Sequence, residues 1–208
     1  MELTKKKFKA HPWHGVSIGS ESPKKVTAYI EIIPTDVVKY EIDKDSGYLR
    51  IDRPQKYSNY CPSLYGFIPQ TYCGKRVGLN CSEKTGRVIS FGDRDPIDIC
   101  VLTEKAIQHG DILVKAVPIG GFRLIDKDEA DDKIIAVLDQ DGVYGHFRDI
   151  EECPKSLIDS LRHYFLTYKE IPGEASGKIE IAETYGAQVA QEVIKLAQLD
   201  YEETFNIE

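Results

Sequence analysis

Three aspartates, Asp93, Asp95 and Asp98, crowd into six consecutive positions immediately before a run of apolar residues. Carboxylates this close together repel one another and raise one another's pKa, a cost that a chain tolerates where cations lie among them. Oxygen ligands suit Mg²⁺, Mn²⁺ or Ca²⁺ rather than zinc, and Pro96 stiffens the turn that would hold them. The triplet therefore predicts a site for hard divalent cations, with a solvated acidic turn as the alternative.

A calcium-binding EF-hand loop does not fit this segment. Glu104 lies at the twelfth position counted from Asp93, as that loop requires, but Ile97 and Asp98 occupy the fifth and sixth positions, where an acid and a glycine are needed. The apolar residues that follow continue as a strand, whereas an EF-hand requires a flanking helix. We therefore expect a cation site of a different kind.

Further charged residues follow patterns that could place them beside this triplet. A second acidic stretch, 126–132, lies between two apolar segments and ends at Lys133, which opens the second of them. Lys39 and Glu41 fall on one face of an expected strand, and Glu31 is the only charged residue in another. Taken singly, each favours a solvated surface charge. Taken together, they supply cation-binding acids and positive charges that grip phosphate, which is what phosphoryl transfer to water needs.

The elements that must position these residues are mostly strands. A period of two from Val26 to Ile33 predicts a strand that ends at Pro34, and Gly110-Asp111 and Gly120-Gly121 supply turns between later strands. Residues 44–47 predict a hairpin turn between the second and third strands. The expected strands span 26–34, 37–43, 48–52, 97–102, 112–119, 122–125, 133–138 and 178–182.

Two helices are expected late in the chain. Leu157, Leu161, Phe165 and Tyr168 recur at helical spacing, and Pro154 suits the first turn of that helix. A second amphipathic helix fits 184–199. This order of elements predicts a fold class that is mainly β with flanking helices, in which a small closed barrel has two late α-helices packed outside it.

Composition favours one globular domain over residues 1–208, with an irregular arm at 1–24 and a polar surface loop at 74–92. The formal net charge of −7 argues against nucleic-acid and membrane partners. Five cysteines without a CxxC pair predict free thiols, and hence a cytoplasmic protein. No signal peptide is expected, nor any apolar run long enough to span a membrane.

The chain resembles the soluble family I inorganic pyrophosphatases over about residues 29–169, roughly two-thirds of its length. The family signature D-x-D-P-x-D appears here as Asp93-Arg-Asp-Pro-Ile-Asp98. Other family motifs follow in the family's order, and this order makes the resemblance specific. They are Ile30-Glu-Ile32, Lys39-Tyr-Glu41, Asp52-Arg53, Leu64-Tyr-Gly-Phe67, Asp126 with Asp131-Asp-Lys133, and Tyr164-Phe-Leu-Thr-Tyr-Lys169.

The resemblance implies hydrolysis of pyrophosphate to two orthophosphates by a multi-metal mechanism, with Mg²⁺ as the cofactor and Mn²⁺ or other divalent cations as alternatives. Asp95 would be the general base that accepts a proton from the attacking water. The cation ligands would be Asp93, Asp98, Asp131, Asp126 and Glu31. The phosphate contacts would be Lys39, Arg53, Lys133, Tyr168 and Lys169. Glu41 and Tyr65 would support the metal and water network.

The resemblance also implies a five-stranded barrel of OB type and a homo-oligomer, since bacterial members are commonly hexamers and eukaryotic ones dimers. We expect a hexamer rather than a dimer. Two residues depart from the family pattern: Arg94 stands where glycine is usual, and Cys61 where tyrosine is frequent. No role is assigned to either of them.

Three other functions remain as alternatives at this point. A hydrolase of nucleotides or longer polyphosphates would use the same acids and lysines. An OB-type nucleic-acid binder would need a basic groove lined with aromatic side chains, whereas the tyrosines here lie among acids. A degenerate member of the family would bind metal without turnover, which the retained acids and lysines argue against.

Overall fold

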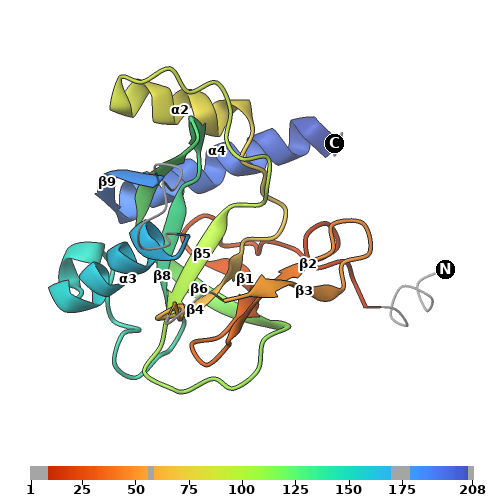
Figure 1. The fold of residues 1–208 in the computed structure, drawn as a ribbon, viewed down its shortest axis with the longest axis vertical. Helices are drawn as coiled ribbons and strands as arrows, with labels where there is room; N and C mark the ends of the chain where they lie inside the picture. Colours follow the sequence, from red (N-terminus) through yellow and green to blue (C-terminus); the bar gives the residue numbers. More distant parts are fainter. Residues whose placement is uncertain (1–8, 56–58, 170–178, 206–208) are drawn as a thin grey trace.

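The computed structural model describes residues 9–55, 59–169 and 179–205 (Figure 1). The fold is mainly β-sheet with three α-helices, α2 (Lys75–Thr85), α3 (Lys155–Thr167) and α4 (Ala187–Phe205), and a short 3₁₀ turn, η1 (Ile150–Glu152). The strands are β1 (Val26–Ile32), β2 (Val38–Ile42), β3 (Leu49–Pro54), β4 (Leu64–Phe67), β5 (Asp98–Leu102), β6 (Ile112–Asp126), β7 (Glu129–Ala130), β8 (Lys133–Leu138) and β9 (Ile179–Gly186).

Five of these strands form a ring of pairings. β1 pairs with β4, β4 with β5, β5 with β8 and β8 with β6, and β6 returns to pair with β1. The β5–β8 pair is parallel, and the other four are antiparallel. The long strand β6 also pairs with β9, and β2 and β3 form the separate hairpin that the turn at 44–47 predicts.

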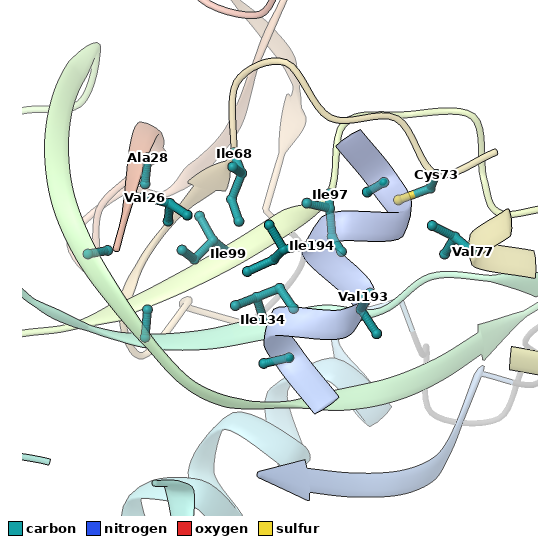
Figure 2. Packing of buried hydrophobic residues seen from close by; sticks show 14 of the residues in the cluster. Val26, Ala28, Ile68, Cys73, Val77, Ile97, Ile99, Ile134, Val193 and Ile194 are labelled. Atoms are coloured by element: carbon teal, nitrogen blue, oxygen red, sulfur yellow. The ribbon is translucent and has the colours of Figure 1, made fainter. Parts of the chain in front are cut away.

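Successive residues of β8 point alternately into two apolar clusters, as the pleat of a strand requires. Ile134 belongs to the first cluster, which joins the ring to α4 and in which Ile194 of that helix packs near Ile99 (Figure 2). Ile135 belongs to the second cluster, which joins the ring to α3. Each fully buried Ile or Val contributes about 1.5–3 kcal/mol relative to an exposed one. The two helices are thereby fixed on opposite faces of this part of the sheet.

The expected turn at Gly120-Gly121 is wrong, because both glycines lie inside one continuous strand, β6. A Cβ on Gly120 would lie 2.5 Å from the carbonyl oxygen of Tyr185, and a Cβ on Gly121 would lie 2.5 Å from the Tyr185 ring. These glycines therefore allow β9 to approach β6 closely, rather than reversing the chain.

The segment 74–92 holds a helix, α2, instead of the expected surface loop. Val77 and Cys81 of this helix are buried, and α2 and α4 lie together at the top of Figure 1. The start of α2 has no local side-chain cap; the carboxylate of Asp200 on α4 accepts hydrogen bonds from the backbone N–H groups of Gly74, Arg76 and Val77. An acceptor that satisfies the free N–H groups of a helix start stabilises it, and this acceptor comes from the other end of the chain.

The described part of the expected N-terminal arm, residues 9–24, consists of turns, and its Trp13 is buried next to Phe205. The expected strands at 26–34, 37–43, 48–52, 97–102 and 133–138 are confirmed within a few residues at their ends. Both expected helices are present, but Pro154 is the N-cap of α3 rather than a first-turn residue, and the helix expected at 184–199 spans Ala187–Phe205, since 184–186 belong to β9. None of the helices in the described ranges has the length and apolar character that crossing a bilayer requires.

Candidate active site

A pocket of about 220 Å³ gathers nearly all the residues that the sequence predicts for the site. It lies between the β2–β3 hairpin, the edge of the ring where β5 and β8 begin, and the C-terminal end of α3. The predicted residues that line it are Glu31, Lys39, Glu41, Arg53, Tyr65, Asp93, Asp95, Asp98, Asp131, Lys133, Tyr168 and Lys169. Asp126 is not in its lining.

At the base of the pocket, the parallel pairing of β5 with β8 places Asp98 opposite Lys133. The Lys133 ammonium donates a hydrogen bond to Asp131 Oδ1 at 2.5 Å and another to Asp98. The Tyr65 hydroxyl on the neighbouring strand β4 donates to Asp98 Oδ2 at 2.5 Å. The strand register therefore brings together two acids separated by more than thirty residues of sequence.

Two acids of this pocket, Asp93 and Asp98, have raised pKa values. Burial, followed by repulsion from Asp131, raises the pKa of Asp93 well above its usual range. Burial also raises the pKa of Asp98, against the opposing effect of Lys133. The carboxylates of Asp98 and Asp131 in turn raise the pKa of Lys133, although burial opposes this. Added positive charge would favour the ionised carboxylates, which is the property of a cation site.

The donor set suits a hard cation, because Asp93, Asp98 and Asp131 offer only carboxylate oxygens to one pocket. Among the residues that the structure describes, no three His, Cys, Asp or Glu side chains are placed closely enough to hold a metal ion as they stand. The Lys133 ammonium occupies the position between Asp98 and Asp131 instead. The three acids fit cation ligands once this lysine turns away from them.

Asp95 lies at the exposed side of the pocket, with 42% of its side chain exposed. Its carboxylate forms an ion pair with Lys44, which projects from the turn between β2 and β3. Lys44 lines the pocket and was missed by the sequence reasoning. Its position in the turn of the hairpin that carries Lys39 and Arg53 is the signal that could have identified it.

The hairpin places two positively charged side chains next to each other, because Lys39 and Arg53 are Cα partners on β2 and β3. The Lys39 ammonium pairs with Glu41 at 2.8 Å and with Asp52 at 3.1 Å. Arg53 pairs with the same Asp52 at 2.5 Å. The two acids thereby hold the Lys39 and Arg53 side chains in the pocket lining, where their positive charges would attract an anionic substrate.

Glu31 is buried and does not face solvent, so the alternative of a solvated surface charge is excluded for this residue. Its Oε1 accepts a hydrogen bond at 2.7 Å from the backbone N–H of Ile42, which ties β1 to β2. Burial raises the pKa of Glu31 to about 8. A carboxyl group held neutral in a pocket of acids is one that a bound cation would ionise.

The C-terminal end of α3 places Tyr168 and Lys169 in the pocket lining. Tyr168 is the C-cap residue of the helix and stacks on Tyr164, with ring centroids 5.3 Å apart. The Lys169 ammonium donates to Asp126 Oδ2 at 2.6 Å, so Asp126 touches the site through this lysine. Asp126 therefore lies next to the pocket and contacts a lining residue, although it is not part of the lining itself. The pocket lining also includes Gln55 and Tyr164, which were not predicted.

The two departures from the family pattern lie outside the pocket lining. Cys61 is buried in the apolar cluster under α3, with its sulfur 3.9 Å from the Ser63 hydroxyl. Arg94 has a φ of +65°, in the left-handed region that favours glycine. Its guanidinium pairs with Glu129 at 2.9 Å and lies over the Phe91 ring.

We expect Arg94→Gly to leave the rate of a reaction catalysed in this pocket, and its dependence on divalent cations, unchanged, because the side chain points toward Glu129 rather than into the pocket. The lost surface ion pair is worth about 0–1 kcal/mol, and relief of the left-handed backbone about 1 kcal/mol in the opposite direction. Arg94→Ala loses the same contacts without that relief, so it should unfold at lower temperature than Arg94→Gly. A several-fold change in rate for Arg94→Gly would mean that Arg94 acts on the neighbouring acids.

Known proteins resemble this chain over nearly its whole length. A family model described as inorganic pyrophosphatase matches residues 28–202. An inorganic pyrophosphatase of Chlamydia trachomatis serovar L2 is 53% identical over 196 residues, covering 92% of this chain and 94% of the relative. The soluble inorganic pyrophosphatase of Oryza sativa subsp. indica is 38% identical over 168 residues, covering 81% of this chain and 70% of the relative.

Solved structures agree with these relatives. The structure of an inorganic phosphatase from Anaplasma phagocytophilum aligns with a TM-score of 0.74 and 29% identity, covering 90% of this chain and 99% of that one. That of an inorganic pyrophosphatase from Ehrlichia chaffeensis aligns with a TM-score of 0.65 and 30% identity, covering 88% and 98%. The chain therefore belongs to the inorganic pyrophosphatase family, a metal-dependent family, and is a hydrolase that cleaves the phosphoanhydride bond of pyrophosphate.

Proposed function

We propose that the pocket described above is the active site in which pyrophosphate is hydrolysed, with Mg²⁺ as the cofactor. One observation carries this proposal: three acids, Asp93, Asp98 and Asp131, face the same pocket as four basic side chains. The acids suit cations and the basic groups suit the substrate's phosphates. The four basic side chains that we assign to the phosphates are Lys39, Arg53, Lys133 and Lys169, whereas the fifth in the lining, Lys44, pairs with Asp95.

In this proposal Asp93, Asp98 and Asp131 hold the two most tightly bound cations. Asp126 and Glu31 contribute to the site of further cations that arrive with the substrate. Mg²⁺ is the preferred ion because every donor is a carboxylate oxygen, and Mn²⁺ suits the same donors. Cations bound there would make water more acidic and would screen the negative charge of pyrophosphate.

Asp95 is the group that we assign as general base. Its carboxylate is within the pocket and partly exposed, so it can take a proton from a water that attacks the nearer phosphorus. The water attacks in line with the departing phosphate, whose charge Lys39, Arg53 and Lys169 balance. Lys133 exchanges its contacts with Asp98 and Asp131 for a phosphate oxygen.

Three side chains orient the groups that react or bind. Glu41 accepts a hydrogen bond from Lys39 at 2.8 Å, which supports a role in aiming that ammonium at the substrate. The Tyr65 hydroxyl, fixed on Asp98, would keep the carboxylate directed into the pocket. Tyr168 would donate its hydroxyl to a phosphate oxygen, since it lines the pocket next to Lys169.

Further proposals concern the whole molecule. The ring of five strand pairings supports a closed barrel of OB type. Exposed apolar residues such as Val37, Ile51 and Leu113 support a homo-oligomer, for which the family resemblance favours a hexamer over a dimer. The five unpaired cysteines support a cytoplasmic location, and the net charge of −7 disfavours nucleic-acid and membrane partners.

Release of orthophosphate from pyrophosphate tests the proposed site and cofactor. We expect release with Mg²⁺, loss of release with excess chelator, and its return when Mg²⁺ is added back. ATP and tripolyphosphate in parallel reactions separate this activity from that of a general polyphosphate hydrolase. Release that persists in excess chelator, at the same rate as with Mg²⁺, would contradict the assigned role of the acids.

A further inference from the structure

A charge network with a fully buried ion pair at its centre lies beside the pocket. Its centre is Arg123 of β6, a side chain with no exposed surface, and its acid is Asp132, which is also fully buried. The network includes residues from β6, β9 and α2, and β9 runs beside β6 (Figure 1). No residue of the proposed mechanism belongs to it.

Asp132 is held by contacts from two strands. Tyr185 on β9 donates its hydroxyl to Asp132 Oδ1 at 2.8 Å, and Arg123 Nη1 lies 3.9 Å from the same oxygen. Arg123 is fixed in turn, since its Nε donates to Glu183 at 2.9 Å and its Nη1 to Asn80 at 3.0 Å. The guanidinium also lies 5.2 Å from the centre of the Tyr185 ring.

Asp132 stands between two residues of the proposed active site. Asp131 and Lys133 line the pocket, whereas the Asp132 side chain faces Tyr185 and Arg123 instead. In extended chain, successive side chains point to opposite sides. A rotation of the segment that moved Asp132 would therefore also turn Asp131 and Lys133. The backbone N–H of Asp131 bonds to Leu124 of β6 at 2.9 Å, which fixes the position of the segment along the strand.

Stability alone does not explain this network. Arg123 Nη2 and Asp132 Oδ2 are buried and find no hydrogen-bond partner among the residues that the structure describes. Each such atom costs about 1–3 kcal/mol. Apolar side chains of similar volume often replace a buried ion pair at no loss of stability. The buried charges next to Asp131 therefore point to a role other than stabilisation of the core.

We propose that Asp132, held by Tyr185 and Arg123, is a positioning residue that fixes the direction in which Asp131 and Lys133 enter the pocket, and thereby sets the affinity for divalent cations. This inference rests on the proposed roles of Asp131 and Lys133 in the active site. Replacing a residue that orients metal ligands without itself binding the metal typically lowers metal affinity or activity about 10–100-fold.

Binding of Mn²⁺ to the substrate-free protein, measured by titration calorimetry, tests the inference without turnover. Asp132→Asn keeps the shape and the contact with Tyr185 but removes the charge, and we expect it to weaken Mn²⁺ binding about 10–100-fold. It should also lower kcat more than it raises KM. The control is Asp141→Asn, since the Asp141 carboxylate also accepts hydrogen bonds that hold the local structure but lies outside the pocket lining. It should lower the melting temperature and leave Mn²⁺ binding unchanged.

Tyr185→Phe provides a second measurement if Asp132→Asn does not fold. It removes one hydroxyl and keeps the ring that packs against Gly121, and we expect Mn²⁺ binding to weaken severalfold. Wild-type affinity in folded Tyr185→Phe and Asp132→Asn would overturn the positioning role. Equal losses of affinity in Asp132→Asn and Asp141→Asn would overturn it as well. Failure of the wild-type protein to bind Mn²⁺ would instead contradict the proposed function of the pocket.

Discussion

Asp95→Asn is expected to lower kcat for pyrophosphate hydrolysis about 10²–10⁴-fold, the usual contribution of a general base. Asparagine has the size of aspartate but cannot accept the proton of the attacking water. The requirement for Mg²⁺ should change little, because the proposed cation ligands are Asp93, Asp98 and Asp131. Initial rates of phosphate release at saturating Mg²⁺ and substrate measure the effect.

The backbone at Asp95 is held independently of its carboxylate, so the substitution should not disturb the fold. The Asp95 N–H donates to Asp93 Oδ1 at 3.1 Å, and its carbonyl accepts from the N–H of Cys73 at 2.8 Å. The carboxylate itself is 42% exposed and pairs with Lys44, and such surface pairs contribute about 0–1 kcal/mol. The melting temperature of Asp95→Asn should therefore stay close to that of the wild type.

Lys44→Gln is the matched control, because it breaks the same ion pair and leaves the carboxylate in place. A general base at Asp95 predicts a far smaller loss of kcat in Lys44→Gln than in Asp95→Asn. Similar losses in both variants would instead assign the effect to the ion pair. Turnover of Asp95→Asn at the wild-type rate would remove Asp95 from the role of base.

Much of this fold was predictable from the sequence because the signals that define it are local. The continuous apolar run at 134–138 indicates a strand buried on both faces, and the helical spacing of Leu157, Leu161 and Phe165 indicates a helix buried on one face; the structure contains both. A pattern of this kind depends only on neighbours within a few residues. Most strands and helices that carry the site follow from it, but β4, which carries Tyr65, is not among the expected strands.

The helix α2 escaped prediction because what stabilises it is not local. Asp200 caps it from about 120 residues further along the chain. Gly78 lets the helix pack against the backbone of Phe91, since a Cβ there would lie 2.5 Å from Phe91. A glycine within a polar segment predicts a loop from local preference alone. Only the position of α4 shows that the segment 74–92 has a partner to pack against.

The site residues likewise fall into two groups: those that sequence patterns identify, and those that only the folded structure brings together. Asp93, Asp95 and Asp98 were identified because they are close in sequence, and family motifs located Lys133 and the other basic groups. Lys44 was missed because its charge reaches Asp95 only after the β2–β3 hairpin folds over the pocket. The network of Arg123 and Asp132 was missed because strand pairing, rather than sequence spacing, brings its members together.

Asp98→Asn is expected to raise the free Mg²⁺ concentration for half-maximal rate at least about tenfold, because it removes one carboxylate charge from the proposed cation site. Asp98 is the first residue of β5, and Tyr65 and Lys133 hold its side chain. The amide can still accept both of these hydrogen bonds, so the pocket should keep its shape. The charge is then the main property that changes.

Rates measured over a range of free Mg²⁺ at fixed pyrophosphate test this prediction, and Mn²⁺ titration of the substrate-free protein provides an independent measurement. Asp36→Asn is a suitable control, since Asp36 accepts a backbone hydrogen bond from Ile33 and lies outside the pocket lining. A ligand role for Asp98 requires that its variant recover most of its rate at high Mg²⁺, whereas loss of a general base is not recovered by added metal. If the Mg²⁺ curve of Asp98→Asn coincides with that of the wild type, the carboxylate at the start of β5 contributes nothing to cation binding. The cation site would then have to be built from Asp93 and Asp131 without Asp98.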